Sequence, residues 1–104
     1  MHKGIDIPAP KNTQIIASND GIVSFSGKKK GYGNVVILKH DNNIFSIYAH
    51  NSKNLIPNNK LVKKGEVIAL VGSTGKSTGN HLHFEIREGT KPINPITFLK
   101  NQKQ

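Results

Sequence analysis

The chain has 104 residues, of which 15 are lysine or arginine and 6 are aspartate or glutamate, so its formal charge is +9 with neutral histidines. This length suits one hydrophobic core, and we predict a single domain over residues 1–104. No apolar run approaches the ~20 residues that cross a bilayer, which excludes a transmembrane helix. The absence of cysteine excludes disulfide scaffolds and thiol catalysis, so any metal would be held by histidine, aspartate or glutamate.

Short clusters of β-branched residues, separated by glycine, proline and asparagine, predict an almost entirely β fold without an amphipathic helix. Turn residues bound each predicted strand, and Asp41-Asn42-Asn43 between two alternating strands is the strongest hairpin signal. We therefore expect antiparallel hairpins. The predicted strands are Gln14–Ala17, Gly21–Ser26, Asn34–His40, Ile44–His50, Val67–Val71 and Leu82–Arg87.

Three short segments outside these strands also have predictable conformations. Lys28-Lys29-Lys30, between two glycines, is expected to form a loop tip. Pro95–Leu99 is expected to form a short helical turn near the end of the domain. The polar residues 100–104 are expected to be a frayed tail.

The excess of positive charge has a functional interpretation. A domain of charge +9 is attracted to polyanions, so nucleic acid, anionic lipid and anionic cell-wall polymers are candidate partners. A lysine-rich surface without a special partner is an equal alternative. Arginine is scarce, tryptophan is absent and the aromatic residues fall within strands, all of which disfavour nucleic acid.

The glycine-rich segment Gly72–Gly79 contains Gly75-Lys76-Ser77, which resembles part of a phosphate-binding loop. That motif needs a glycine five residues before its Gly-Lys pair, where this chain has Leu70. The residues that follow predict a turn into a strand, so no helix N-terminus would hold phosphate. We expect no nucleotide binding and interpret the segment as a turn.

Two pairs of residues favour metal or acid–base chemistry. His81 and His83 lie two residues apart in a predicted strand, so their imidazoles should share one face. His2 and Asp6, four residues apart, should likewise share one face of an extended segment. Imidazole and carboxylate ligands without thiolate suit a catalytic zinc ion, which takes three protein ligands and leaves one position open.

Each histidine also has an ordinary structural interpretation. His50 ends a third predicted strand, on the same face as Tyr48. His40, at a strand end, is better explained as a hydrogen-bonded residue than as a ligand. For His2 the alternative is a loose terminus, and only the combination of residues favours a metal site.

Seven motifs occur in an order that is typical of one family. Together they resemble the lysostaphin-type (LytM-like) zinc metalloendopeptidases, which cut peptide cross-links of the bacterial cell wall. The resemblance extends from His2 to about Pro95 and implies an all-β fold, a compact antiparallel β-sandwich-like domain with a groove across one sheet. The motifs are His2-Lys-Gly-Ile-Asp6, Asp20-Gly-Ile-Val23, Gly31-Tyr-Gly-Asn34, Tyr48-Ala-His50, Gly72-Ser-Thr-Gly75, Ser77-Thr-Gly79 and His81-Leu-His-Phe-Glu85.

The resemblance implies a role for each matching residue. His2, Asp6 and His83 match the three zinc ligands, whereas His50 and His81 match two histidines that do not bind the metal. One of these two would take a proton from the attacking water and the other would hydrogen-bond the developing oxyanion, and the sequence does not assign which. The groove would be lined by Tyr32, Gly33, Asn34, Tyr48, Ser73, Thr74, Ser77 and Thr78.

The chain also departs from the family pattern. Family members usually carry residues upstream of the first ligand, so we expect this domain to lack upstream family residues and an export signal of its own. Asn58-Asn59 stands where glycine is common, a change that the tolerance of asparagine for left-handed geometry allows. Three segments are most similar to the NlpD-type branch, whose envelope proteins activate cell-wall amidases: Leu55–Gly65, which contains this pair, Ala49-His-Asn51 and Asn94–Leu99.

The sequence therefore predicts a zinc-dependent endopeptidase that hydrolyses peptide cross-links of peptidoglycan in the periplasm, elsewhere in the cell envelope or outside the cell. The alternative is a non-catalytic activator of a cell-wall amidase that acts in cell division and keeps the groove as a protein-binding surface. A basic nucleic-acid-binding β domain is the least favoured interpretation. The intact site residues favour the enzyme.

Overall fold

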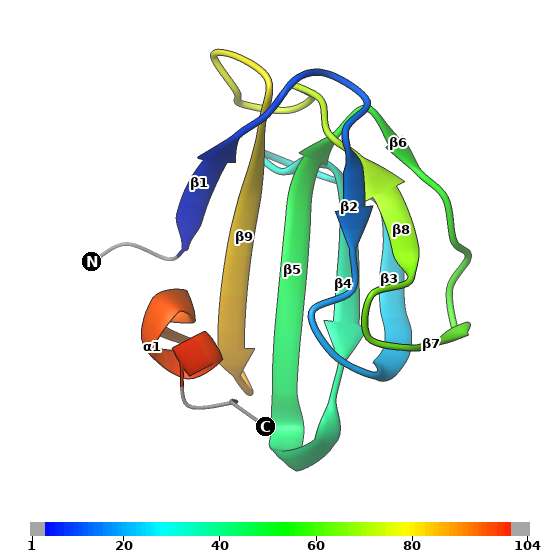
Figure 1. The fold of residues 1–104 in the computed structure, drawn as a ribbon, viewed down its shortest axis with the longest axis vertical. Coiled ribbons are helices and arrows are strands. Elements are labelled where there is room, and N and C mark those ends of the chain that lie inside the picture. Colours follow the sequence, from blue (N-terminus) through cyan, green and yellow to red (C-terminus); the bar gives the residue numbers. More distant parts are fainter. Residues whose placement is uncertain (1–3, 101–104) are drawn as a thin grey trace.

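The structure is a computed structural model that describes residues 4–100 (Figure 1). A 3-10 turn, η1 (Asp41–Asn43), joins the fourth and fifth strands, and a short helix, α1 (Pro95–Lys100), follows the last strand. In this part of the chain, no helix combines the length and the hydrophobicity needed to span a bilayer. The strands are β1 (Ile5–Pro8), β2 (Gln14–Ile16), β3 (Gly21–Lys29), β4 (Gly33–Lys39), β5 (Ile44–Asn51), β6 (Lys53–Asn54), β7 (Leu61–Val62), β8 (Val67–Leu70), β9 (His81–Glu88) and β10 (Lys91–Ile93).

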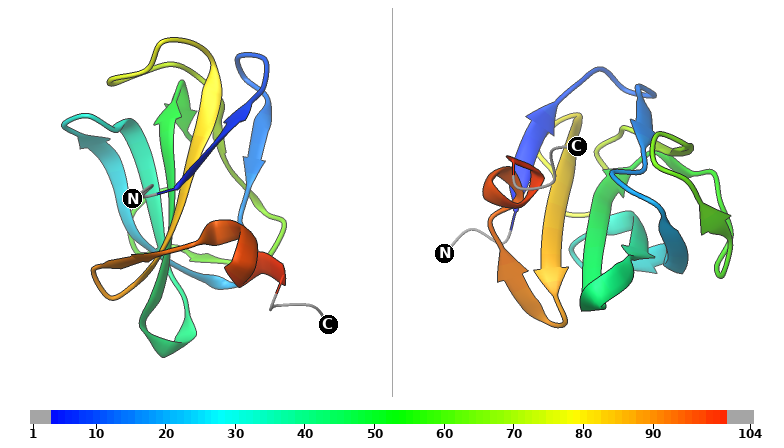
Figure 2. Two further views of the ribbon diagram at one scale, coloured as in Figure 1. Left: turned by 90° about the vertical axis from the view of Figure 1, so that its left-hand side faces the viewer. Right: turned by 60° about the horizontal axis from the view of Figure 1, so that its bottom comes forward.

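Between residues 4 and 100, the strands form two antiparallel sheets. The large sheet has the order β1-β9-β5-β4-β3-β7, with β10 also paired to β9, and the small sheet has the order β2-β8-β6. Figures 1 and 2 show the small sheet as a second layer against the large one. This arrangement confirms the predicted antiparallel β-sandwich-like fold.

The main hydrophobic core lies between the two sheets. Alternation along the strands of the large sheet points every second side chain toward the small sheet. The intervening residues Val35, Ile47 and Ala49 form a second cluster on the opposite face. The core between the sheets includes Ile15, Val36, Leu38, Tyr48, Ile68, Ala69, Phe84 and Ile86.

Most sequence predictions of local structure agree with these elements. Each of the six predicted strands is present with ends shifted by a few residues, η1 forms the predicted hairpin turn, and α1 forms the predicted helical turn. The prediction of a loop tip at Lys28-Lys29-Lys30 is wrong for its first two residues. Lys28 pairs with Asn34 and Lys29 with Gly33, because the turn lies later, where Gly31 adopts φ +84°. The predicted tail is wrong for Lys100, which belongs to α1, and residues 101–104 lie outside the described residues.

A chain of polar contacts crosses the core at Tyr48. The Tyr48 hydroxyl donates to Oγ of Ser18 (3.0 Å) and accepts from the Ser18 N–H (3.0 Å) and the Ser46 hydroxyl (2.9 Å). Ser46 Oγ also lies 2.7 Å from Nε2 of His40, whose Nδ1 lies 2.6 Å from the carbonyl oxygen of Asp20. His40 is thus tied on both ring nitrogens, as its structural interpretation predicts.

Replacing Tyr48 with phenylalanine should lower the free energy of unfolding by about 1–3 kcal/mol, because the Ser18 N–H and the Ser46 hydroxyl would lose a buried partner. Tyr48 is only 1% exposed, so water cannot easily take the place of its hydroxyl. Urea unfolding monitored by circular dichroism measures the change. An unchanged free energy of unfolding would show that these contacts contribute no net stability.

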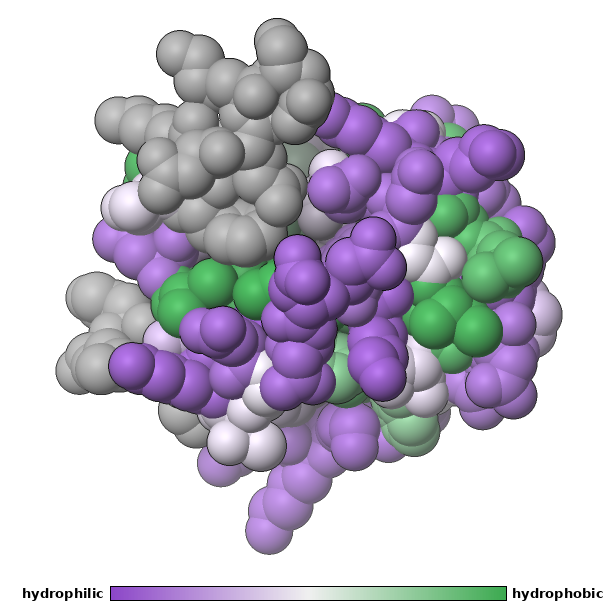
Figure 3. Space-filling model, turned by 90° about the horizontal axis from the view of Figure 1, so that it is seen from below, coloured by the Kyte–Doolittle hydropathy of each residue, from purple (hydrophilic) through white to green (hydrophobic). Residues whose placement is uncertain are grey.

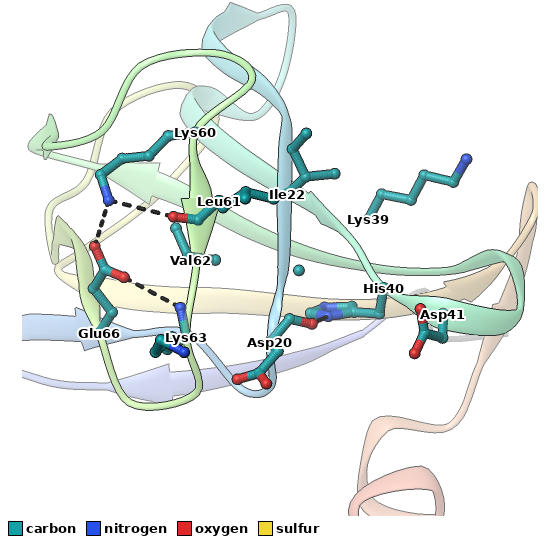
Figure 4. Close-up of a pocket in the computed structure, with 11 residues that line it drawn as sticks. Asp20, Ile22, Lys39, His40, Asp41, Lys60, Leu61, Val62, Lys63 and Glu66 are labelled. Carbon is teal, nitrogen blue, oxygen red and sulfur yellow. Dashed lines mark hydrogen bonds and ion pairs between the residues drawn. The ribbon is translucent and has the colours of Figure 1, made fainter.

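The face of the molecule that Figure 3 shows is mainly hydrophilic. Seen from below, its apolar residues form separate patches among charged and polar ones (Figure 3). A pocket of about 780 Å³ lies between β3, β4 and β7 (Figure 4). Two of its carboxylates have partners, since Glu66 pairs with Lys60 at 2.9 Å and Asp20 accepts the N–H of Lys64 at 2.7 Å.

Candidate functional site

Strands β1, β5 and β9 bring the predicted site residues together on the face of the large sheet that points away from the small sheet. In the strand register, His83 of β9 is opposite Asp6 of β1 on one side and Ala49 of β5 on the other. Oδ1 of Asp6 lies 2.7 Å from Nδ1 of His83 and 3.3 Å from Nε2 of His81. The two imidazoles therefore share one face, as their spacing predicts, and the carboxylate lies between them.

His50 reaches this group through an unusual backbone conformation. Its φ is +66°, and its ring centroid lies 5.1 Å from that of His81 and 5.8 Å from that of His83. Regular alternation would have placed His50 on the same side as Tyr48. The left-handed conformation turns it to the other side, so the prediction that His50 and Tyr48 share a face is wrong.

Tyr48 is also not a groove residue. Its ring is buried in the core between the sheets and packs against Phe84, with ring centroids 5.3 Å apart. Phe84 is the strand neighbour of His83 and therefore points to the opposite face. The prediction for Tyr48 assumed regular strand alternation, in which Tyr48 and His50 share a face. The left-handed conformation of His50 breaks that alternation.

His2, the third predicted ligand, lies outside the described residues. Within residues 4–100, no three or more histidine, aspartate or glutamate side chains are arranged to hold a metal ion. The donors that are described nevertheless fit zinc, which binds imidazole nitrogen and carboxylate oxygen such as those of His83 and Asp6. In addition, Nε2 of His83 lies 2.8 Å from Oε2 of Glu85, and such a carboxylate commonly supports a metal-binding histidine.

Hydrogen bonds determine which nitrogen of His50 and of His81 carries a proton. Nδ1 of His50 lies 2.6 Å from the carbonyl oxygen of Thr74, and Nδ1 of His81 lies 3.0 Å from that of Gly79. A carbonyl oxygen can only accept, so Nδ1 is the donor in both rings and Nε2 is left for the site. Burial lowers the pKa of His50, which favours the neutral ring with a free lone pair on Nε2.

His83, Asp6 and Glu85 shift the pKa values of one another. The hydrogen bond to Glu85, followed by that to Asp6, raises the pKa of His83. The hydrogen bond to His83 lowers the pKa of Asp6. Burial raises the pKa of Glu85, but hydrogen bonds from His83, Arg87 and Tyr32 outweigh burial, so the pKa of Glu85 is lowered. The site therefore holds both carboxylates ionised.

Glu85 is a residue of this site that has no role among the sequence predictions. It is fully buried, although glutamate rarely is without a partner. Its position two residues after His83 in the same strand was a usable signal, because residues at that spacing share a face. Because glutamate is charged, an exposed position would be expected for it.

Two loops beside the histidines are joined by close backbone contacts. The N–H of Lys76 donates to the carbonyl of Gly31 (3.1 Å), and the N–H of Asn34 donates to Oγ1 of Thr74 (3.0 Å). Gly33 has φ +68°, and a Cβ there would lie 2.5 Å from backbone atoms of Thr74 and Gly75. The segments 31–34 and 72–79 thus form one continuous edge, which we call the groove rim.

The predicted groove residues other than Tyr48 belong to this groove rim, although several of their polar groups are already engaged. The hydroxyl of Tyr32 donates to Glu85 at 2.9 Å, and the amide of Asn34 donates to the carbonyl of Asn51 at 3.0 Å. Oγ of Ser77 lies 3.2 Å from Nδ1 of His81. Contact with a substrate therefore stays a prediction for Tyr32, Gly33, Asn34, Ser73, Thr74, Ser77 and Thr78.

Replacing Gly33 with alanine should lower the free energy of unfolding by at least about 2 kcal/mol, because a left-handed φ and a clash with Thr74 both disfavour a Cβ. Gly79→Ala is the matched control, since a Cβ there meets no atom within 4 Å. Thermal and urea unfolding measure both variants. Equal stability of the two would contradict the close approach of the two loops.

Comparison with known proteins gives consistent results. Residues 1–95 match peptidase family M23. The chain is 47% identical over 97 residues to the DD-carboxypeptidase/endopeptidase Mpg of Neisseria meningitidis serogroup B, a match that covers 93% of this chain and 22% of that protein. It is 46% identical over 99 residues to the murein hydrolase activator NlpD of Escherichia coli K12, covering 94% of this chain and 26% of that protein. The chain thus spans about a quarter of the length of these relatives.

The fold is shared with a solved peptidase. The structure superimposes on the catalytic domain of the antimicrobial peptidase lysostaphin from Staphylococcus simulans with a TM-score of 0.90 and 32% sequence identity. This similarity covers 96% of the present chain and 80% of the lysostaphin chain. The family match over nearly the whole sequence and the common fold show that the chain belongs to peptidase family M23 and has the lysostaphin-type domain that its motifs indicate.

Proposed function

We propose that this domain is a zinc-dependent endopeptidase that hydrolyses peptide cross-links of peptidoglycan. The observation that supports the proposal is the clustering of one carboxylate and three imidazoles from β1, β5 and β9 on one face of the large sheet, beside the groove rim. His2, Asp6 and His83 are the proposed ligands, and the place of His2 among them rests on its match to the family motif. The peptidase relatives Mpg and lysostaphin are consistent with this activity.

The hydrogen bonds of His50 and His81 support a proposed role for each ring. A zinc ion bound here would supply a Lewis acid that lowers the pKa of water to about 7 and polarises the scissile carbonyl. His50, whose Nδ1–H is held by Thr74, presents Nε2 as a general base for the attacking water. His81 would be the partner of the oxyanion, to which its Nε2 can donate only when the ring carries a second proton, and this nitrogen is directed to the same centre as Asp6.

A second function is favoured by the similarity to NlpD, which is a murein hydrolase activator. In that case the groove rim would bind a cell-wall amidase and the domain would cleave nothing by itself. Both functions concern peptidoglycan, so we propose a location in the cell envelope or outside the cell. They differ in whether the domain breaks bonds on its own.

The test uses the purified chain with zinc-depleted and zinc-supplied samples. Metal content is measured by mass spectrometry, and soluble fragments released from purified peptidoglycan are measured by chromatography, with and without an added amidase. An endopeptidase should bind one zinc ion per chain and release peptide-cleaved fragments alone. Release that occurs only with the amidase, and that zinc depletion leaves unchanged, would support the activator instead.

A further inference from the structure

A polar cluster, formed by the buried Glu85 and the partly buried Tyr32 and Arg87, lies against His83. His83 presents Nδ1 to Asp6 at 2.7 Å and Nε2 to Glu85 at 2.8 Å, so its ring lies between two carboxylates. These carboxylates differ in their surroundings, since the side chain of Asp6 is 64% exposed and that of Glu85 is 1% exposed. The two nitrogens of His83 are therefore not equivalent.

The contacts assign every proton in the cluster. Arg87 can only donate, and its Nη2 and Nε bond to Oε1 of Glu85 at 2.8 and 3.0 Å. Nη2 of Arg87 also donates to the Tyr32 oxygen at 3.0 Å, so the Tyr32 proton is directed to Oε2 of Glu85 at 2.9 Å. Glu85 is then an acceptor in each contact, and Nε2 of His83 must be a donor to it.

The burial of Glu85 also supports a proton on Nε2 of His83. A buried carboxylate is costly unless it is paired and hydrogen-bonded, and removing one donor from such a group leaves the cost uncompensated. Arg87 balances the charge of Glu85, whereas water can solvate the exposed Asp6. When the neutral ring of His83 has a single proton, that proton therefore belongs on Nε2, facing Glu85, and the lone pair belongs on Nδ1, facing Asp6.

We propose that Tyr32, Glu85 and Arg87 act as positioning residues that hold the proton of His83 on Nε2 and direct the lone pair of Nδ1 toward the metal position beside Asp6. This inference rests on the proposed zinc function only for its consequence, which is metal affinity. The assignment of the proton is independent of it. Because Tyr32 belongs to the groove rim, the same contacts tie that rim to the proposed metal ligand.

The first experiment tests the assignment in the wild-type protein without metal. Long-range ¹H–¹⁵N correlation spectra of the histidine rings, recorded at a pH where His83 is neutral, distinguish its two tautomers. We expect the Nε2–H form in the wild type and loss of that preference in Glu85→Gln. The Nδ1–H form in the wild type would overturn the proposal, and this outcome requires no variant to fold.

The second experiment measures zinc affinity by competition with a chromophoric chelator. Glu85→Gln should weaken zinc binding by about 10- to 100-fold, the range typical of residues that support a metal ligand. Glu88→Gln is the matched control, because it makes the same change at an exposed position of β9 and should leave the affinity unchanged. Circular dichroism identifies folded samples.

The outcomes separate this inference from the proposed function. Unchanged affinity in a folded Glu85→Gln variant would overturn the positioning role while leaving a zinc peptidase intact. A wild-type protein that binds no zinc would contradict the proposed function, but the tautomer of His83 would still decide the assignment of its proton.

Discussion

Replacing His83 with alanine should remove tightly bound zinc and reduce peptidoglycan cleavage to background. Nδ1 of His83 and Oδ1 of Asp6 lie 2.7 Å apart and would hold the same ion, and a catalytic zinc ion has only three protein ligands. Replacing a residue that only supports a metal ligand typically weakens metal binding by about 10- to 100-fold. The loss of zinc affinity in His83→Ala should be larger than this. Chelator competition and the release of soluble fragments measure the two effects.

His40→Gln is the control for this prediction. His40 lies outside the site and is bonded to Ser46 and Asp20, so a polar replacement should leave zinc binding unchanged. Retention of one zinc ion per chain in His83→Ala would show that the ligand assignment is wrong. Loss of zinc in His40→Gln would instead indicate a general loss of structure.

Replacing either His50 or His81 should leave zinc bound and slow hydrolysis by about 100-fold or more, the effect expected when a positioned acid–base group is lost. For His50 the informative replacement is asparagine, because asparagine tolerates the left-handed φ of +66° that this position requires. For His81, alanine is suitable, since its backbone lies in the regular strand β9. Zinc content measures whether the metal stays bound, and kcat/KM on a cross-linked peptide substrate measures the rate of hydrolysis.

The decisive result is that hydrolysis slows while zinc stays bound. If His81→Ala removed the metal, His81 would be a ligand and the assignment of His83 would need revision. If both variants kept their zinc and their full rate, the two histidines would have no part in hydrolysis. Activation of an amidase that persists in both variants would favour the second proposed function.

The larger strands could be predicted because their sequence signals are local. Clusters such as Val35–Leu38 combine β-branched residues with flanking turn residues, and these features alone identify a strand. The short strands β1, β6, β7 and β10 were not predicted, since two to four residues become a strand only when a neighbouring strand pairs with them. The extension of β3 through Lys28 and Lys29 has the same origin, because β4 continues the pairing.

The site was predictable to the extent that it depends on strand alternation. His81 and His83 share a face because β9 is regular, whereas His50 leaves the face of Tyr48 because a single residue adopts a left-handed conformation. Histidine and asparagine are among the residues that most often do so, but the sequence does not indicate where. The buried position of Glu85 depends on Arg87 and Tyr32, and the latter lies 53 residues away in the chain.

The contact between Gly33 and its neighbours in the other loop has a consequence for how a substrate can enter. The Lys76 N–H bonds to the carbonyl of Gly31, and Gly33 lies against Thr74 and Gly75, so one segment of the groove rim can move away from the other only by breaking these contacts. For the proposed endopeptidase we therefore expect access to the histidines through an opening of constant width, so that the choice among cross-bridges would depend on which peptides fit it.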